Sequence, residues 1–577
     1  MSDEDDIEDI TLSQAAAASG PSHAALFEAP PSTPGAGPGA TAASTSIDGG
    51  TAGDPRARSK WITDTQHGMV RLSPDAVAII DTPPFQRLRD LYQLGCAYWV
   101  WPCAAHKRFE HCIGTYHLAE TMMQNFFDRS RHVRSEGAEI DISREDVHMV
   151  SIAGLVHDLG HGPFSHVFDS EVVRRLSPGV PREQLWTHEQ MTCKMFDWMC
   201  DEYALGYDES QRKLIHDLVT ASEDKDLERH KRRERPWLYE VVSNPRNSID
   251  VDKFDYLQRD ARATGVGGCC NFERLVKFAR VLDGEVCWWS KDAFNLYQLF
   301  HTRASMHKTV YTHPKVKAVE YMVTDALVAA HAHLGLRDAM DDPELFVGLS
   351  DYVLKLLEHA RPVHHPRKGS GGAVRAAADA VAAAQASLLG TAESDDWEGV
   401  RTAQGIIRRL NRRQVYKYIG QAMIPQRRID AFDHKKVCAE DIVACQPNAE
   451  LQVDDVIVHN QTINFSMGSS NPMTRVSFFT DWDVRQKEPI DKDQVSSLLP
   501  DHFQEKSVRV FCRSMDKTKQ EAAEKALEQF VRKNELVAGA QTPGTPIGVG
   551  MRTTRMTDSA ARAQAQSKRR RLEQHTD

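Results

Sequence analysis

The sequence of 577 residues contains no long hydrophobic run and no secretory signal. A membrane-spanning helix needs roughly 20 apolar residues in succession, and no stretch approaches that length. The N-terminus is acidic between Asp3 and Asp9, whereas a secretory signal begins with basic residues and continues with apolar ones. We therefore expect a protein that stays inside the cell and has no membrane partner.

Regular cysteine spacing and an excess of positive charge are also missing. The eleven cysteines are scattered, and Cys269 and Cys270 are direct neighbours, so neither a disulfide framework nor a zinc knuckle is indicated. The formal net charge of −10 argues against a protein coated in positive charge for nonspecific nucleic-acid binding. A local basic groove would not show in a whole-chain sum, so single-stranded nucleic acid stays open as a partner.

Large apolar residues are scarce at both ends of the chain and in one internal stretch. Residues 1–57 and 538–577 bury too little surface to offset the entropy of ordering, so we predict two disordered tails. The basic run from Lys568 to Arg571 is typical of a nuclear import signal, which predicts a nuclear location and leaves a cytoplasmic share open. Residues 361–405 combine glycine-rich, alanine-rich and acidic stretches, and we predict a flexible low-complexity insertion there.

Between these segments the apolar residues mostly follow helical spacing. They recur three and four positions apart in three stretches, 147–156, 296–310 and 319–334, while strand signals are sparse. The pattern predicts a large helical core over 58–360.

The region after this core has a mixed pattern. Residues 517–531 have a helical composition, and three stretches resemble short strands, 453–458, 475–480 and 508–512. We predict a smaller C-terminal α+β lobe over 406–537, so the fold class as a whole is mainly α.

Histidine and aspartate gather in one short segment, VHDLGHGPFSHVFD, at residues 156–169. His157 and Asp158 project about 100° apart on a helix, so both can reach one ion lying over its end. Glycines and a proline then end the helix and turn the chain, which would bring His161 and His166 to the same cavity.

Two further ligands complete a metal site in this reading, His111 upstream and Asp252 downstream. With His157 and Asp158 they form a set of two imidazoles and two carboxylates, which suits transition metals better than calcium. Burying such a set without an ion would leave costly unpaired polar groups. The sequence therefore predicts a transition-metal ion, with iron, manganese or zinc as the expected metals.

These four residues match the H…HD…D pattern of the HD phosphohydrolase superfamily. Longer strings narrow the match: IDTPPFQRLRDLYQLG, KRFEHCIGTYHLA, AGLVHDLGHGPFSHVFD, WTHEQM, NSIDVDKFDYLQRDA and NLYQLFHTRASMH. Together they resemble the vertebrate dNTP triphosphohydrolases that carry a SAM domain and an HD domain. The resemblance runs from about residue 60 to about residue 535, interrupted by the insertion. We expect no SAM domain, because the N-terminal tail has too few apolar residues to build one.

The resemblance implies the HD-domain helical phosphohydrolase fold and cleavage of a dNTP, bound with Mg²⁺, to a deoxynucleoside and inorganic triphosphate. It implies that His166 faces the scissile α-phosphate, that Asp169 and His188 form a proton relay, and that His161 contacts the α-phosphate. The residues implied to hold the triphosphate and the deoxyribose are Arg108, Lys253, Arg303, Gln93, Leu94, Tyr256, Asp260 and Tyr311.

The resemblance also implies activation by GTP or dGTP together with a dNTP, through formation of a homotetramer. The implied guanine-reading site comprises Lys60, Asp81, Gln86 and Arg89. The implied second effector site comprises Val100, Trp101, Arg274, Lys291, Asn295 and His313. This sequence departs from the pattern at Thr63, where the family has Asn, and at Thr309, where an Arg is expected, so the effector rule stays open.

Two other readings remain at this point. The chain could be a different HD phosphohydrolase, such as a 5′-nucleotidase or a phosphodiesterase, or a catalytically silent nucleic-acid-binding protein. Product analysis separates the enzymes, because only the favoured reaction releases intact triphosphate. All predicted ligands and catalytic groups are present, which argues against a silent protein.

Overall fold

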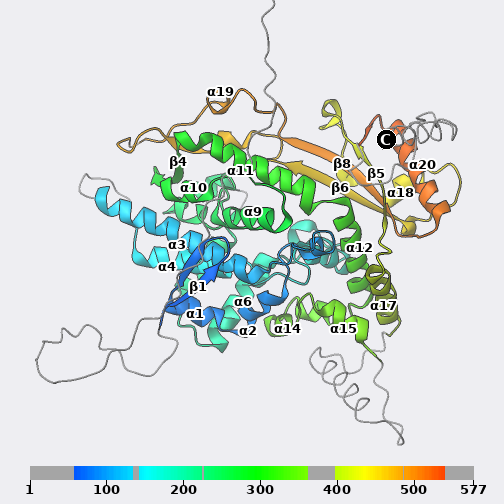
Figure 1. Cartoon of the computed structure of the whole chain (residues 1–577), viewed down its shortest axis with the longest axis horizontal. Helices are drawn as coiled ribbons and strands as arrows, with labels where there is room; N and C mark the ends of the chain where they lie inside the picture. Colours follow the sequence, from blue (N-terminus) through cyan, green and yellow to red (C-terminus); the bar gives the residue numbers. More distant parts are fainter. Residues whose placement is uncertain are drawn as a thin grey trace, which may run out of the picture. The chain divides into compact units, whose positions relative to one another are not determined.

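The computed structural model describes residues 58–133, 142–223, 226–268, 270–361, 397–484 and 486–539 (Figure 1). The predicted N-terminal tail, most of the C-terminal tail and most of the insertion lie outside these residues. No helix within the described ranges is both long enough and apolar enough to cross a membrane.

Three helices form the centre of the fold: α3 (Arg108–Val133), α4 (Arg144–Val156) and α9 (Val251–Thr264). α3 packs against both α4 and α9. The start of α4 is set by Ser143, whose side chain accepts from the backbone N–H of Asp146, while the Asp146 carboxylate accepts from Ser143 in return. α9 begins after Asp250, which caps the N–H of Lys253, and ends at Gly265, whose φ of 71° favours glycine. α3 and α9 carry His111 and Asp252, and His157 and Asp158 directly follow α4.

Other helices surround this centre. They are α1 (Pro74–Ile80), α2 (Pro83–Gln86), α5 (Arg174–Leu176), α6 (His188–Glu202), α7 (Glu209–Val219), α8 (Leu227–Lys231), α10 (Phe272–Phe278), α11 (Ala293–Met306), α12 (Pro314–Ala329), α13 (Leu336–Ala339), α14 (Pro343–Val347) and α15 (Val353–His359). The three predicted helical stretches are confirmed as parts of α4, α11 and α12, although α11 changes into a π-helical turn at His307 and α12 ends at Ala329.

The strands form three small sheets. β1 (Lys60–Asp64) and β2 (Gly68–Leu72) make a hairpin. β4 (Glu285–Trp289) lies between antiparallel β3 (Arg280–Leu282) and parallel β7 (Ser477–Phe479). The third sheet is antiparallel, in the order β6 (Val456–Asn464), β8 (Gln504–Cys512), β5 (Lys417–Met423), β9 (Val537–Ala538). The prediction of a mainly α protein with a C-terminal α+β region is confirmed.

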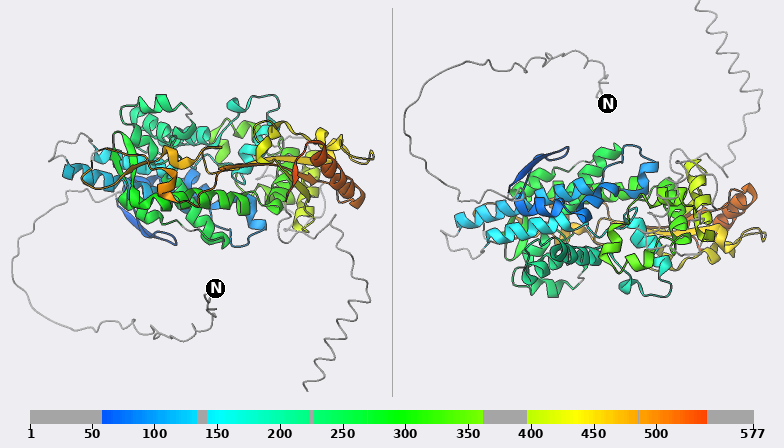
Figure 2. Two further views of the ribbon diagram at one scale, coloured as in Figure 1. Left: turned by 90° about the horizontal axis from the view of Figure 1, so that it is seen from above. Right: turned by 90° about the horizontal axis from the view of Figure 1, so that it is seen from below.

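The C-terminal region contributes to the core of the helical part. β7 completes the sheet of β3 and β4, and Met473, Val476 and Phe478 belong to the same buried hydrophobic cluster as residues of α3 and α9. The remaining helices of this region are α18 (Ala439–Val443), α19 (Lys492–Val495) and α20 (Lys517–Lys533). Figure 1 and Figure 2 show α20 at the end of the fold opposite to α3 and α4.

Two predicted boundaries need correction. α17 (Trp397–Asn411) begins inside the predicted flexible insertion, and its residues Val400 and Ala403 are fully buried against the core. Its apolar face packs on α12 and α15, so residues 397–405 are ordered by tertiary contacts that composition does not reveal. At the other end, Ala538 pairs with Ala422 in β9 although it was assigned to the disordered tail.

Candidate active site

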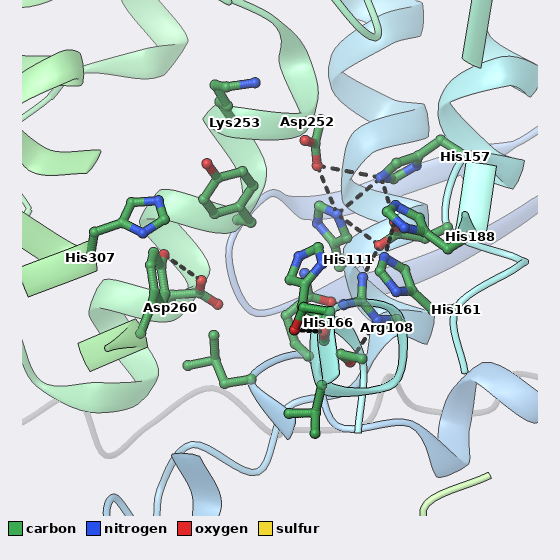
Figure 3. A pocket seen from close by; sticks show the side chains of 18 of the residues that line it. Arg108, His111, His157, His161, His166, His188, Asp252, Lys253, Asp260 and His307 are labelled. Carbon is green, nitrogen blue, oxygen red and sulfur yellow. Dashed lines mark hydrogen bonds and ion pairs between the residues drawn. The ribbon is translucent and has the colours of Figure 1, made fainter. Parts of the chain in front are cut away.

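His111 from α3, His157 at the end of α4 and Asp252 from α9 converge (Figure 3), and Asp158, the fourth predicted metal ligand, directly follows His157. His111 Nε2 lies 3.2 Å from His157 Nε2 and 3.1 Å from Asp252 Oδ1. His157 Nε2 lies 3.3 Å from Asp252 Oδ1 and 3.5 Å from Asp158 Oδ1. Donor atoms bound at about 2.1 Å to one ion, at right or tetrahedral angles, would be separated by about 3.0 to 3.4 Å. The observed spacing is therefore that of a metal site.

The outer nitrogens of both imidazoles are already engaged. His111 Nδ1 lies 2.7 Å from Asp255 Oδ2, and His157 Nδ1 lies 2.9 Å from the carbonyl of Gly154. These contacts direct the two Nε2 atoms at each other, which is the usual support for metal-bound histidine. Burial alone would lower the pKa of His111, but hydrogen bonds to Asp252 and Asp255 outweigh it and raise that pKa to about 10. The carboxylates around His111 therefore favour positive charge at this position, and a divalent cation would supply it.

Asp255 was not predicted as a site residue, yet it holds His111 in place. It is fully buried, and besides His111 it contacts His67 Nε2 at 2.6 Å and Arg259 Nη2 at 2.7 Å. A Cβ at Gly114 would lie 2.0 Å from Asp255 Oδ1, so only glycine lets this carboxylate approach α3. The sequence could have indicated Asp255 as a site residue, because it follows Asp252 by three positions and shares its helix face.

Beside the ligands lies a cavity of about 630 Å³, a size typical of small-molecule sites. The predicted catalytic and substrate residues that line it are His161, His166, His188, Gln93, Leu94, Arg108, Lys253, Tyr256, Asp260, Arg303 and Tyr311. Asp169 lies behind the wall, where its Oδ2 is 2.6 Å from His188 Nδ1. The structure thus brings the predicted catalytic and substrate sets to one place.

Three histidines form a cluster at one side of the cavity. The rings of His161 and His188 stack with centroids 3.7 Å apart, and His166 lies 5.0 Å from His161. Burial would lower the pKa of His188, but Asp169 raises it to about 9. Enclosure in the cavity wall lowers the pKa of His166, and the charges of Arg108 and His188 lower it further. At neutral pH His188 is therefore protonated and His166 is neutral.

The backbone before His166 is strained. Phe164 and Ser165 have φ values of 62° and 60°, in the left-handed region that costs non-glycine residues free energy. Asp351 holds this turn: its Oδ1 accepts from Phe164 N at 2.5 Å, and its Oδ2 accepts from Tyr92 N at 2.8 Å. Burial raises the pKa of Asp351 to about 6. One buried carboxylate thus connects the turn that presents His166 with the segment that leads to Gln93. Sequence reasoning missed it.

Cationic side chains face the cavity from several elements. Arg108 pairs with Asp158 through Nη1, while its Nη2 is buried without a partner among the described residues. Lys253 Nζ contacts Asp250 at 3.0 Å. Arg303 Nη1 donates to the carbonyl of Asn464 at 3.1 Å, and its Nε is likewise buried without a described partner. Donors with unused capacity beside a cavity suit an anionic ligand.

A tyrosine and aspartate wall lies opposite the histidine cluster. The hydroxyl of Tyr311 donates to Asp260 Oδ2 at 2.7 Å, and His106 Nε2 lies 2.7 Å from Asp260 Oδ1. His106 and the cavity-lining His307 were not predicted. Burial lowers the pKa of His307 to about 3, with help from Arg303, so this ring is neutral.

The predicted effector residues lie outside the cavity. Lys60 Nζ pairs with Asp81 at 2.8 Å, and Arg89 Nε donates to Gln86 Oε1 at 2.8 Å. The Gln86 amide donates to the carbonyl of Ile80, next to Asp81, so these four residues form one group. The side chains of Lys60 and Asp81 are about half exposed, at 51% and 55%.

The predicted second effector set falls into two groups. Trp101, which follows Val100, lies against His313 with ring centroids 5.1 Å apart. Arg274, Lys291 and Asn295 lie around the start of α11, whose 14 residues extend about 21 Å toward the π-helical turn before His313. Thr309 hydrogen-bonds to the carbonyl of Ser305 in its own turn.

Comparisons with known proteins agree with this site. The HD domain family profile matches residues 108–260, which include all four predicted metal ligands. The chain is 36% identical over 478 residues to the deoxynucleoside triphosphate triphosphohydrolase SAMHD1 homolog of Dictyostelium discoideum, covering 83% of this chain and 82% of the relative. It is 32% identical over 506 residues to human deoxynucleoside triphosphate triphosphohydrolase SAMHD1, covering 82% and 73%. A putative HD domain-containing protein of Acanthamoeba polyphaga mimivirus is 26% identical over 467 residues, covering 79% and 93%. The chain belongs to the family of HD-domain deoxynucleoside triphosphate triphosphohydrolases.

Proposed function

We propose that this chain hydrolyses dNTPs to deoxynucleosides and inorganic triphosphate. The observation that carries the proposal is that one cavity holds four predicted metal ligands, a histidine cluster, three cationic side chains and a tyrosine–aspartate wall. Two relatives that match most of the chain are named for this activity.

His111, His157, Asp158 and Asp252 would hold a transition-metal ion, for which iron, manganese and zinc are the candidates. Such an ion supplies Lewis acidity, which lowers the pKa of water and stabilises charge on a phosphoryl oxygen. Arg108, Lys253 and Arg303 neutralise the triphosphate together with the Mg²⁺ that accompanies the nucleotide.

The histidine cluster handles the proton that the leaving group needs. Cleavage between the α-phosphorus and the 5′-oxygen leaves an alkoxide that must be protonated. His166 reaches into the cavity, but its lowered pKa leaves it neutral at neutral pH, so it must take up a proton before it can protonate the 5′-oxygen. His188, kept cationic by Asp169, supplies positive charge and a proton source beside it, while His161 contacts the α-phosphate.

The opposite wall selects the sugar. Tyr311 and Asp260 are joined by a hydrogen bond, and Tyr256 lies beside Tyr311 with ring centroids 6.5 Å apart. A rigid wall of this kind, with Gln93 and Leu94 on the other side, leaves little room at C2′ and so favours deoxyribose over ribose.

Activation by GTP or dGTP with a dNTP, through a homotetramer, belongs to the same proposal. Its support is the position of the predicted effector residues. All ten are exposed or half-buried. Those of the second set lie at two places on one chain, so one nucleotide touching both places would lie between copies of the chain. We propose a nuclear location from the basic run in the C-terminal tail, and single-stranded nucleic acid remains a candidate partner.

The test is incubation of the purified chain with dGTP, dATP or ATP in the presence of Mg²⁺ and GTP, with products separated by anion exchange. We expect intact triphosphate from dGTP and dATP and no product from ATP. Release of monophosphate or pyrophosphate would identify a different phosphohydrolase. Light scattering with GTP and dNTP should show a tetramer, and an unchanged mass with full activity would refute the activation scheme.

A further inference from the structure

A second set of metal-binding side chains lies beside the first. His161, His166, Asp169 and His188 each offer one nitrogen or oxygen donor atom, and these four atoms lie within 4.8 Å of one another. Figure 3 shows the three imidazoles grouped next to His111 and His157. Three imidazoles and one carboxylate are donors that zinc binds in tetrahedral sites.

Two of these donor groups have atoms with no partner among the described residues. His161 is 1% exposed, its Nε2 lies 3.2 Å from Asp158 Oδ1 of the first set, and its Nδ1 is buried and unpaired. Asp169 gives Oδ2 to His188, while its Oδ1 is buried and unpaired. Unpaired polar atoms in the interior are costly, so both have spare capacity for a ligand.

The cluster can accept an ion with small movements. Two donors bound tetrahedrally at about 2.1 Å to one ion are about 3.4 Å apart, so atoms that lie within 4.8 Å of one another need to close by up to about 1.4 Å. His166 is exposed to the cavity, which gives an ion a way in. His161 divides its two nitrogens between the sets, since one faces Asp158 and the other is free for the second ion.

We propose that His161, His166, Asp169 and His188 form a second, inhibitory metal site whose preferred ion is zinc. Binding would displace the proton shared by His188 and Asp169, which passes to solvent, and would occupy the imidazole that faces the leaving group. The ion would thus remove the proton-handling groups while the first set keeps its metal. Inhibition rests on the proposed function, but binding of the second ion does not.

The test is a titration of the full chain, freed of metal, with Co²⁺ and with Zn²⁺. Ligand-field absorption and calorimetry give the number of ions bound and their geometry. We expect two ions in the wild type, and one in either His188→Ala, which breaks the second set, or Asp252→Ala, which breaks the first. His301→Ala removes an exposed histidine of α11 outside the cavity, and it should still bind two.

One ion in the wild type, unchanged in His188→Ala, would overturn the second site. A second ion that persists in His188→Ala would do the same, since it would lie elsewhere on the chain.

In the activity assay, zinc added to the loaded enzyme should reduce turnover by at least about tenfold, in line with the contribution of acid–base groups. Two ions without any dNTP hydrolysis would refute the proposed function alone, whereas one ion with full hydrolysis would refute this site alone.

Discussion

The catalytic cavity and the predicted effector surfaces are built in different ways. In the cavity, side chains from distant parts of the chain meet within one copy, and buried partners such as Asp255 and Asp351 hold them. The predicted effector residues are exposed or half-buried and contact their neighbours, as in the pair of Lys60 with Asp81. The difference teaches that one folded chain brings the predicted catalytic residues together, whereas the proposed effector sites would be completed only by a nucleotide and a second copy.

The largest effect should come from a metal ligand. We expect His157→Ala to lose the first metal ion and to lower turnover about a thousandfold or more, because Lewis acidity contributes several kcal/mol to such reactions. Metal content and triphosphate release measure the two losses. Near-normal turnover at reduced metal content would show that the cavity is not the catalytic site. The contrast between this cavity and the predicted effector surfaces would then no longer hold.

Substitution of Asp169, the carboxylate behind the cavity wall, should have the next largest effect on turnover. Asp169→Asn removes the partner that raises the pKa of His188 to about 9, so that pKa should fall toward the ordinary value of 6.5. We expect turnover to drop about a hundredfold. In the wild type kcat/KM should decline as pH rises through about 9, and in the variant this decline should begin at lower pH. An alkaline limb that does not move would contradict the relay.

Substitution of Asp351, the buried carboxylate that contacts the backbone of Phe164 and of Tyr92, should have a moderate effect on kcat/KM. Asp351→Asn keeps one acceptor but turns an amide N–H₂ toward the backbone N–H of either Phe164 or Tyr92. An unsatisfied buried group costs about 1–3 kcal/mol, so we expect roughly a tenfold loss of kcat/KM together with a lower Tm. The metal content should stay normal. Asp341→Asn, an exposed change nearby, is the control, and equal effects of both variants would refute the positioning role.

The smallest effect on the single chain should come from the effector surface. Lys60→Ala removes an exposed ion pair, and such pairs contribute about 1 kcal/mol or less. Metal content and Tm should therefore be unchanged, while GTP-driven tetramer formation should be lost in light scattering. Lys231→Ala breaks a comparable exposed pair with Glu228 and should respond to GTP normally. A normal GTP response of Lys60→Ala would remove this residue from the effector site.

Local patterns predicted a large part of the fold and of the site. Helical spacing identified α4, α11 and α12, since an apolar face must be buried whatever the neighbours are. The His157-Asp158 pair and the outlying His111 and Asp252 were found because metal ligation restricts residue type. α17 was missed where it overlaps the predicted insertion, because its order comes from packing on α12 and α15.

The sequence by itself determined which helices form and which side chains can bind a metal, because both depend on residue type and short-range spacing. The tertiary structure alone decided that Asp351 holds a turn 187 positions away, and that His106 and Tyr311 share Asp260. Such contacts depend on how packed elements bring distant backbone and side-chain atoms within hydrogen-bonding distance. No local pattern in one chain encodes that distance.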